Sequence, residues 1–124
     1  MRTAPLFFAF VIASCAQPSA PVGNPIVSEL AGRFAGAPQS CVPMERNSNL
    51  TAIDPSTLTY RFGNTIYVNH PESPCPGIGP FNTLIVEAYQ SHYCRGDRVR
   101  GLEPGAAIPG PACVLGEWVP YRKP

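Results

Sequence analysis

Four cysteines are spread over the larger, C-terminal part of the chain, at Cys41, Cys75, Cys94 and Cys113. For a small domain outside the reducing cytoplasm, an even number of thiols predicts two disulfide bonds. No two of them have Cys-x-x-Cys spacing, so neither a thioredoxin-like redox site nor a zinc ribbon is indicated. Three pairings are open. We favour the nested one, Cys75 with Cys94 across one strand and Cys41 with Cys113, because both outer cysteines begin a Cys-Val segment.

The two histidines are the other candidates for metal or acid–base chemistry. His70 and His92 each fall in a predicted loop, and nothing in their spacing requires that they meet. The chain has no Gly-x-Ser-x-Gly elbow, no glycine-rich phosphate loop and no His-Glu-x-x-His motif. We therefore expect no catalytic residue, no metal, no cofactor and no enzymatic activity.

Arginines offer a candidate binding patch, formed by Arg95, Arg98, Arg100 and Arg122 and extended by Lys123. Such a patch would bind the phosphates of lipopolysaccharide, because guanidinium groups make two-point contacts with phosphate. Nearby carboxylates would partly neutralise it, at Asp97, Glu103 and Glu117. Arg98 and Arg100 share a face if their strand pairs with the last one.

Two loops carry further signals. The tripeptide Arg95-Gly96-Asp97 matches the sequence that integrins bind, but a turn at Gly96 before a strand explains it better. The loop 74–80 is stiffened by three prolines and one cysteine. A rigid loop loses little entropy on binding, so this loop is a candidate recognition surface, with a plain structural turn as the favoured interpretation.

The first fifteen residues have the layout of an export signal. A basic tip at Arg2 precedes an apolar run over 5–12, and small residues come directly before Cys15. The segment Ile12-Ala13-Ser14-Cys15 resembles the lipobox of bacterial lipoproteins. The resemblance implies cleavage before Cys15, attachment of diacylglycerol to its thiol and acylation of the new amino terminus.

Ordinary secretion is the alternative, with cleavage after Ala16. The apolar run is too short to span a bilayer, which takes about 20 residues. Ala16, rather than Asp, follows Cys15, and by resemblance to enterobacterial lipoproteins this favours the outer membrane. We expect the protein in the cell envelope, anchored to the periplasmic face of the outer membrane, or otherwise soluble in the periplasm or secreted.

Composition limits the mature chain to one small domain. About 110 residues remain after cleavage, and removing Arg2 leaves eight basic against eight acidic residues. A chain with no net charge has no general attraction to nucleic acid or to anionic lipid. The 16 prolines and 11 glycines argue against long helices and for short strands joined by turns.

The sequence divides into a signal peptide (1–14), the acylated cysteine with a flexible linker (15–24) and a single disulfide-bonded domain (25–124). Asn24 as N-cap and Pro25 as first residue predict a helix over 25–34. Its apolar face is expected to pack on a sheet, through Ile26, Val27, Leu30 and Phe34.

From Cys41 onward the pattern is that of strands. The segments 58–62 and 65–69 flank Gly63-Asn64, which predicts a two-residue hairpin pairing Tyr60 with Tyr67 and Arg61 with Ile66. Further strands are predicted at 50–53, 82–89, 97–102 and 114–121. Five to six short strands with one helix indicate a mainly β (α+β) fold, a small antiparallel barrel or rolled sheet.

The segments 93–97 and 113–122 resemble an uncharacterised family of short exported proteobacterial proteins. The shared features are a leader, four spaced cysteines and a closing Cys-x-x-Gly-acidic-aromatic-Val-Pro-Tyr-Arg segment, here Cys113 to Arg122. The resemblance covers roughly residues 30–124. It implies the domain limits and the disulfides, and it transfers no catalytic residue.

Two classes of function follow. The favoured one is an outer-membrane-anchored lipoprotein acting as a non-enzymatic structural or interaction module, with an envelope protein or lipopolysaccharide as partner. The alternative is a small secreted or periplasmic inhibitor or ligand-binding protein.

Overall fold

The computed structural model describes residues 25–46 and 50–124. The predicted signal peptide, Cys15, the linker and the capping Asn24 lie outside the described residues. The described part contains one helix and ten strands: α1 (Pro25–Glu29), β1 (Phe34–Ala35), β2 (Cys41–Pro43), β3 (Leu50–Asp54), β4 (Thr57–Phe62), β5 (Thr65–Asn69), β6 (Thr83–Glu87), β7 (His92–Cys94), β8 (Arg98–Leu102), β9 (Cys113–Val114) and β10 (Trp118–Arg122).

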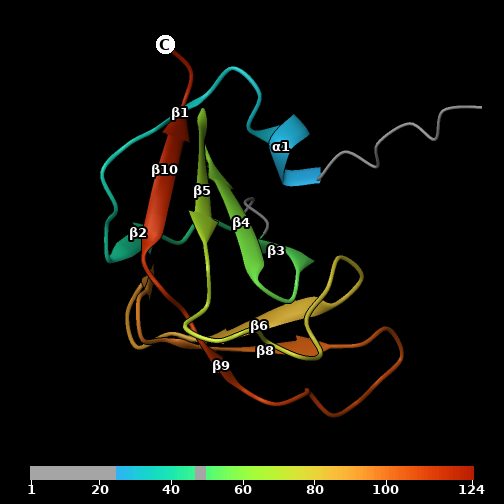
Figure 1. Ribbon diagram of the computed structural model, residues 1–124. Coiled ribbons are helices and arrows are strands. Elements are labelled where there is room, and N and C mark those ends of the chain that lie inside the picture. The colour runs from blue at the N-terminus through green and yellow to red at the C-terminus, as the bar shows by residue number, and fades with distance from the viewer. Residues whose placement is uncertain (1–24, 47–49) are drawn as a thin grey trace, which may run out of the picture.

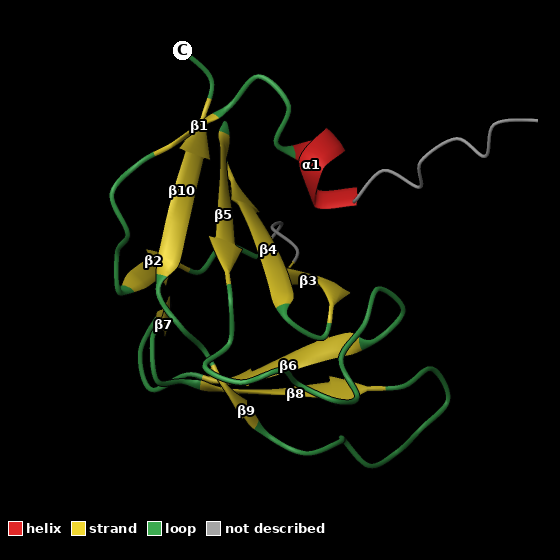
Figure 2. Ribbon diagram, in the orientation of Figure 1, coloured by secondary structure: helices red, strands yellow, loops and turns green. Residues whose placement is uncertain are grey.

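The strands form three antiparallel sheets (Figure 1). The largest has the order β1-β10-β5-β4-β3, a second has the order β6-β8-β9, and β2 pairs with β7. Figure 2 shows β6 and β8 running crosswise below the five-stranded sheet, and α1 beside its upper part. The mainly β, antiparallel fold is confirmed. The large sheet is open rather than closed into a barrel, and the described strands outnumber the predicted five or six.

The β4–β5 hairpin forms as predicted. Tyr60 pairs with Tyr67 and Arg61 with Ile66. Gly63 has a φ of 59°, the positive value that the first residue of this turn type requires and that glycine adopts without steric cost.

The helix is shorter than predicted, because it ends at Glu29 instead of continuing to residue 34. Gly32 turns the chain at a φ of 72°, and Phe34 then enters β1 beside Arg122 at the sheet edge. Phe34 and Val27 are each 67% exposed. The predicted apolar face therefore extends over little more than one turn, because residues 30–32 form a turn and Phe34 belongs to a strand.

The predicted strand 114–121 is divided into β9 and β10 by a tight corner at Gly116. A side chain there would collide with the carbonyl oxygen of His70. The fully buried Asn69 side chain replaces a strand partner at this corner, because its Nδ2 donates to the Gly116 oxygen (2.7 Å) and its Oδ1 accepts from the Gly116 N–H (2.9 Å). The corner sends β9 to one sheet and β10 to another.

The core lies between the five-stranded sheet and the two smaller ones. Side chains alternate across a strand, so Leu58, Tyr60, Tyr67 and Trp118 share one face of the large sheet. That face belongs to a single buried cluster with apolar residues from the other sheets and loops, namely Val42, Cys75, Ile78, Val99 and Leu115. The Arg61–Glu29 ion pair places α1 on the opposite face.

Candidate functional site

The disulfides are Cys41–Cys94 and Cys75–Cys113. The nested pairing favoured from the sequence is therefore wrong, and the observed bridges interleave. Cys41 lies directly opposite Cys94 in the β2–β7 ladder. Cys113 begins β9, and its partner Cys75 is buried in the loop that follows β5. Pairing between strands that are distant in the sequence determines which cysteines are joined. Local sequence patterns contain little information about such pairing.

Two disulfides fit an oxidising compartment outside the cytoplasm. Within 25–46 and 50–124, no helix is long and apolar enough to cross a bilayer.

The four predicted patch arginines do not come together. Arg95 pairs with Glu117 (3.2 Å), and Arg100 pairs with Glu87 (3.2 Å). Arg98 and Arg100 share the exposed face of β8, as expected if their strand pairs with β9. Arg122 ends β10, five positions beyond Glu117, which at about 3.3 Å per residue is about 16 Å from the Arg95 pair.

The Arg95-Gly96-Asp97 tripeptide forms a turn. Gly96 has a φ of 90°, and the Asp97 carboxylate is buried, where it accepts a hydrogen bond from the Cys94 N–H (2.8 Å). The buried Asp97 carboxylate therefore stabilises the turn, and β8 begins at the next residue.

The two histidines belong to different surfaces. His70 follows β5, where its Nδ1 lies 2.9 Å from the Ser56 carbonyl oxygen. His92 begins β7 and lines a different groove. Within the described residues no group of three potential metal ligands is found.

A buried aromatic group occupies the junction of the sheets. The rings of Tyr60 and Tyr93 meet edge to face, with centroids 5.4 Å apart, and Trp118 lies on the other side of Tyr60 at 6.2 Å. The Tyr60 hydroxyl donates to the Pro43 oxygen and accepts from the Glu45 N–H, both at 2.9 Å. Burial, with a smaller contribution from Tyr60, raises the pKa of Tyr93 above its ordinary value of 10.0.

The loop predicted as a recognition surface borders an open groove of about 320 Å³. Cys113 of the Cys75–Cys113 bridge lines it, together with prolines from both bridged segments, Pro74, Pro76 and Pro111. Such a wall is stiff, because proline fixes φ and the disulfide joins the two segments.

A second groove, of about 510 Å³, collects basic side chains that the sequence analysis did not group together. We call it the basic groove. It is lined by Arg33, Arg61, Asn64, Thr65, Arg122, Lys123 and Pro124. These residues come from the turn after α1, the β4–β5 hairpin and the end of β10.

The basic groove is held together by Arg33. Its Nη1 donates to the Asn64 carbonyl oxygen (2.6 Å) and to the Tyr121 carbonyl oxygen (3.3 Å). Arg61 has one acidic neighbour at the limit of an ion pair, Glu29 at 3.9 Å. Among the described residues no carboxylate forms an ion pair with Arg33, Arg122 or Lys123.

Arg122 and Lys123 were predicted to form a patch with the arginines of the 95–100 segment, but in the structure they line a groove with Arg33 and Arg61. Arg33 and Arg61 are separated from them by 60 residues or more and meet them only through the strand order β1-β10-β5-β4. The sequence did contain one indication of a basic site near residue 122, because Lys123 is the only lysine of the sequence and adjoins an arginine.

The chain matches no protein-family model, no curated protein and no solved structure. The resemblance to short exported proteobacterial proteins therefore stays a prediction.

Proposed function

We propose that this protein is a lipid-anchored protein of the bacterial outer membrane, whose β domain faces the periplasm as a non-enzymatic structural or interaction module. The observation that carries the proposal is the combination of a lipobox-like segment ending at Cys15 with a domain closed by two disulfides. Both features belong to an exported chain, and each is read from a different part of the sequence. Membership in the exported proteobacterial family is part of this proposal.

The anchor is tested by growing cells with radiolabelled palmitate and recovering the protein from the envelope. We expect label in the wild type and none in Cys15→Ala, because the thiol is the acceptor. Ser14→Ala is the matched control, since it keeps a small residue before the cysteine and should retain the label. Label-free wild-type protein in the soluble fraction would overturn the proposal.

The groove beside the Cys75–Cys113 bridge favours a second candidate, a soluble inhibitor or ligand-binding protein. Its proline walls present apolar surface in a fixed shape, which suits recognition at low entropic cost. This candidate predicts a mature chain that begins at Gln17 and is soluble in the periplasm. Amino-terminal sequencing of the same preparation separates it from the lipoprotein, whose acylated terminus resists sequencing.

A further inference from the structure

We propose that the basic groove binds the phosphate groups of anionic lipids in the membrane in which the Cys15 lipid is embedded, so that the anchored domain lies with this end against the bilayer. The inference rests on the proposed lipid anchor. It adds the surface through which the anchored domain contacts its membrane.

The basic groove carries an excess of positive charge. Four cationic side chains line the basic groove, and within 25–46 and 50–124 Glu29 is the one carboxylate side chain paired with any of them. A carboxylate at Pro124, the last residue of the sequence, would subtract one further charge and leave the groove cationic. The domain as a whole has almost no net charge, so this excess marks one end of a neutral molecule.

The cationic side chains of the basic groove have N–H donors that could bind phosphate oxygens. Arg122 and Lys123 are exposed, and neither donates to a carboxylate among the described residues. Arg33 bonds two carbonyl oxygens, which neutralise none of its charge. Phosphate oxygens are the acceptors that arginine binds best after carboxylates, through paired N–H donors.

The predicted tether joins the domain at the helix next to the basic groove. The described chain begins at Pro25 in α1, whose last residue, Glu29, pairs with Arg61 of the basic groove. Residues 15–24 can span at most about 36 Å, which is comparable to the diameter of a domain of this size. A tether this short keeps the groove at millimolar effective concentration near the bilayer, so weak contacts suffice to hold it there.

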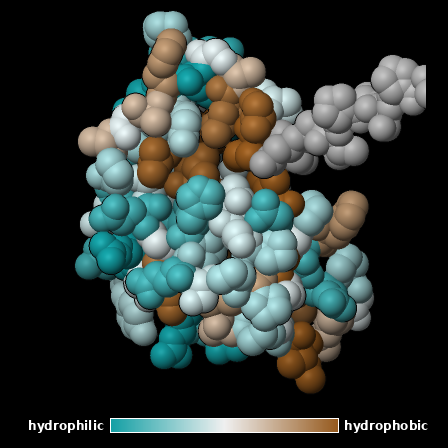
Figure 3. Space-filling view, in the orientation of Figure 1, coloured by the Kyte–Doolittle hydropathy of each residue, from teal (hydrophilic) through white to brown (hydrophobic). Residues whose placement is uncertain are grey.

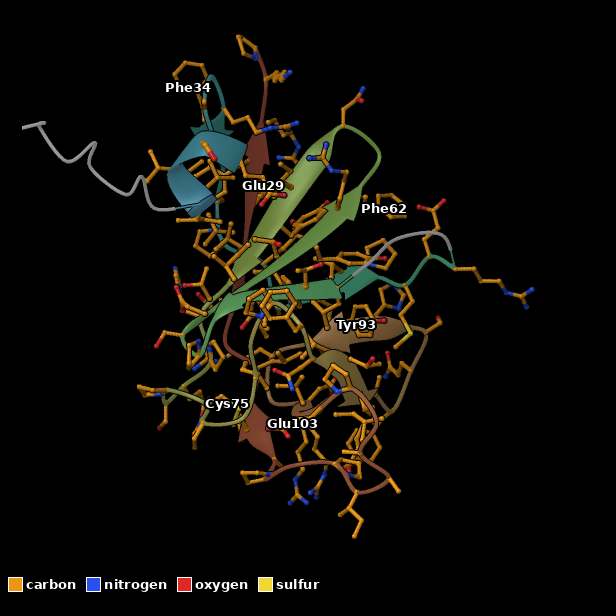
Figure 4. All side chains as sticks on the ribbon, turned by 90° about the vertical axis from the view of Figure 1, so that its right-hand side faces the viewer. Glu29, Phe34, Phe62, Cys75, Tyr93 and Glu103 are labelled. Carbon is orange, nitrogen blue, oxygen red and sulfur yellow. A yellow bond between two sulfur atoms is a disulfide. The ribbon has the colours of Figure 1, made fainter. Side chains whose placement is uncertain are left out.

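The surface around the groove suits a membrane interface. Figure 4 shows Glu29 and Phe34 at one end of the molecule, with Cys75 and Glu103 toward the other. Phe34 at that first end is exposed and pairs with Arg122 in the β1–β10 ladder, and Val27 in α1 is also exposed. In Figure 3, apolar residues gather in the upper half around α1, while the lower half is mostly hydrophilic. Exposed apolar side chains next to basic ones are typical of surfaces that contact anionic lipid.

Lys123 supplies a direct probe. It is the only lysine, and acylation of Cys15 removes the terminal amine, so an amine-reactive ester labels Lys123 alone. The mature lipidated protein is reconstituted at equal density into vesicles of phosphatidylcholine, with or without 30% phosphatidylglycerol. We expect labelling to be at least fivefold slower on the anionic vesicles and to recover at 0.5 M NaCl, which screens the contact.

Two matched substitutions separate the groove from general attraction of cations to the surface. Arg122→Gln and Arg98→Gln each remove one exposed charge from a strand, but Arg122 ends β10 at the top of Figure 1, whereas Arg98 belongs to β8 at the bottom. Arg122→Gln should weaken the protection of Lys123 by about fivefold, the effect of one cation at an anionic surface. Arg98→Gln should leave it unchanged. Labelling on phosphatidylcholine vesicles serves as the reference for each variant.

Three results would overturn the proposal. Equal labelling rates on both vesicles would show that the basic groove does not bind the phosphates of anionic lipid. Equal effects of Arg122→Gln and Arg98→Gln would show that only the local surface potential slows the reaction. Protection by 10 mM inorganic phosphate on phosphatidylcholine vesicles would assign the groove to a free phosphate ligand. Failure of the anchor is distinguishable, because such protein carries no palmitate and does not float with vesicles.

Discussion

At the scale of single residues, Asn69 and Gly116 determine where the chain changes sheets. The Asn69 amide satisfies both backbone polar groups of Gly116 in a fully buried corner. Gly116 must lack a side chain, because the His70 carbonyl oxygen occupies the space that a Cβ would need. The pair thereby separates β9 from β10 and directs Arg122 and Lys123 toward the basic groove.

Asn69→Ala should therefore destabilise the domain strongly. It leaves a buried N–H and a buried C=O without partners, which together cost about 2–4 kcal/mol of unfolding free energy. Urea unfolding followed by tryptophan fluorescence gives the difference, with the exposed loop substitution Gln90→Ala as a control expected to change stability by less than about 0.5 kcal/mol. Equal midpoints for Asn69→Ala and wild type would contradict this role.

Ionisation of Tyr93 should destabilise the folded domain at alkaline pH. Burial raises the pKa of Tyr93 in the folded state above 10.0, so the folded protein holds this proton more tightly than the unfolded chain. The resulting stability is complete below pH 10 and is lost as pH rises from 10 toward the folded pKa. Thermal midpoints measured between pH 9 and 12 should fall less steeply for Tyr93→Phe than for wild type. Tyr89→Phe, at an exposed site, should keep the wild-type slope.

At the scale of elements, each disulfide closes a long loop in a domain with short strands. The bridged residues are 53 and 38 positions apart, so on the chain-entropy model each bridge stabilises the fold by about 4 kcal/mol. Cys75 is also fully buried in the core, whereas Cys41 and Cys94 are half-buried. Removing the second bridge therefore also removes core packing.

Two double substitutions test this difference by calorimetry. Cys41→Ala with Cys94→Ala should lower unfolding free energy by about 4 kcal/mol. Cys75→Ala with Cys113→Ala should cost more, because loss of the sulfurs leaves a buried cavity. The reverse order would show that the core tolerates the loss of Cys75 better than the β2–β7 ladder tolerates the loss of its cross-link.

The elements also show how far the sequence determines the fold. The β4–β5 hairpin was predictable in register because Gly63-Asn64 and its flanking strands are contiguous. The strands β1, β2 and β7 were missed, since each has only two or three residues and forms by pairing with distant chain. The disulfide pairing and the basic groove were missed for the same reason, because both depend on strand order.

At the scale of the whole molecule, charge and covalent cross-links are distributed unevenly. The sheet β6-β8-β9 lies at the lower end in Figure 1 and holds Cys113 of the second bridge and the Arg100–Glu87 ion pair. The basic groove lies at the other, beside the helix that continues from the predicted tether. A molecule with one cationic end and one neutral, cross-linked end can adopt a defined orientation on an anionic membrane, which suits the proposed anchored module.

The proposed function requires that the chain is exported, carries a lipid and has both disulfides closed. Intact-mass spectrometry of protein from the cell envelope, treated with a thiol-alkylating reagent under denaturing conditions, tests all of this in one spectrum. We predict a chain that begins at Cys15, carries its acyl groups and gains no alkyl group until it is reduced, when it gains four. A full-length chain with its leader, or four alkylated cysteines before reduction, would contradict the account.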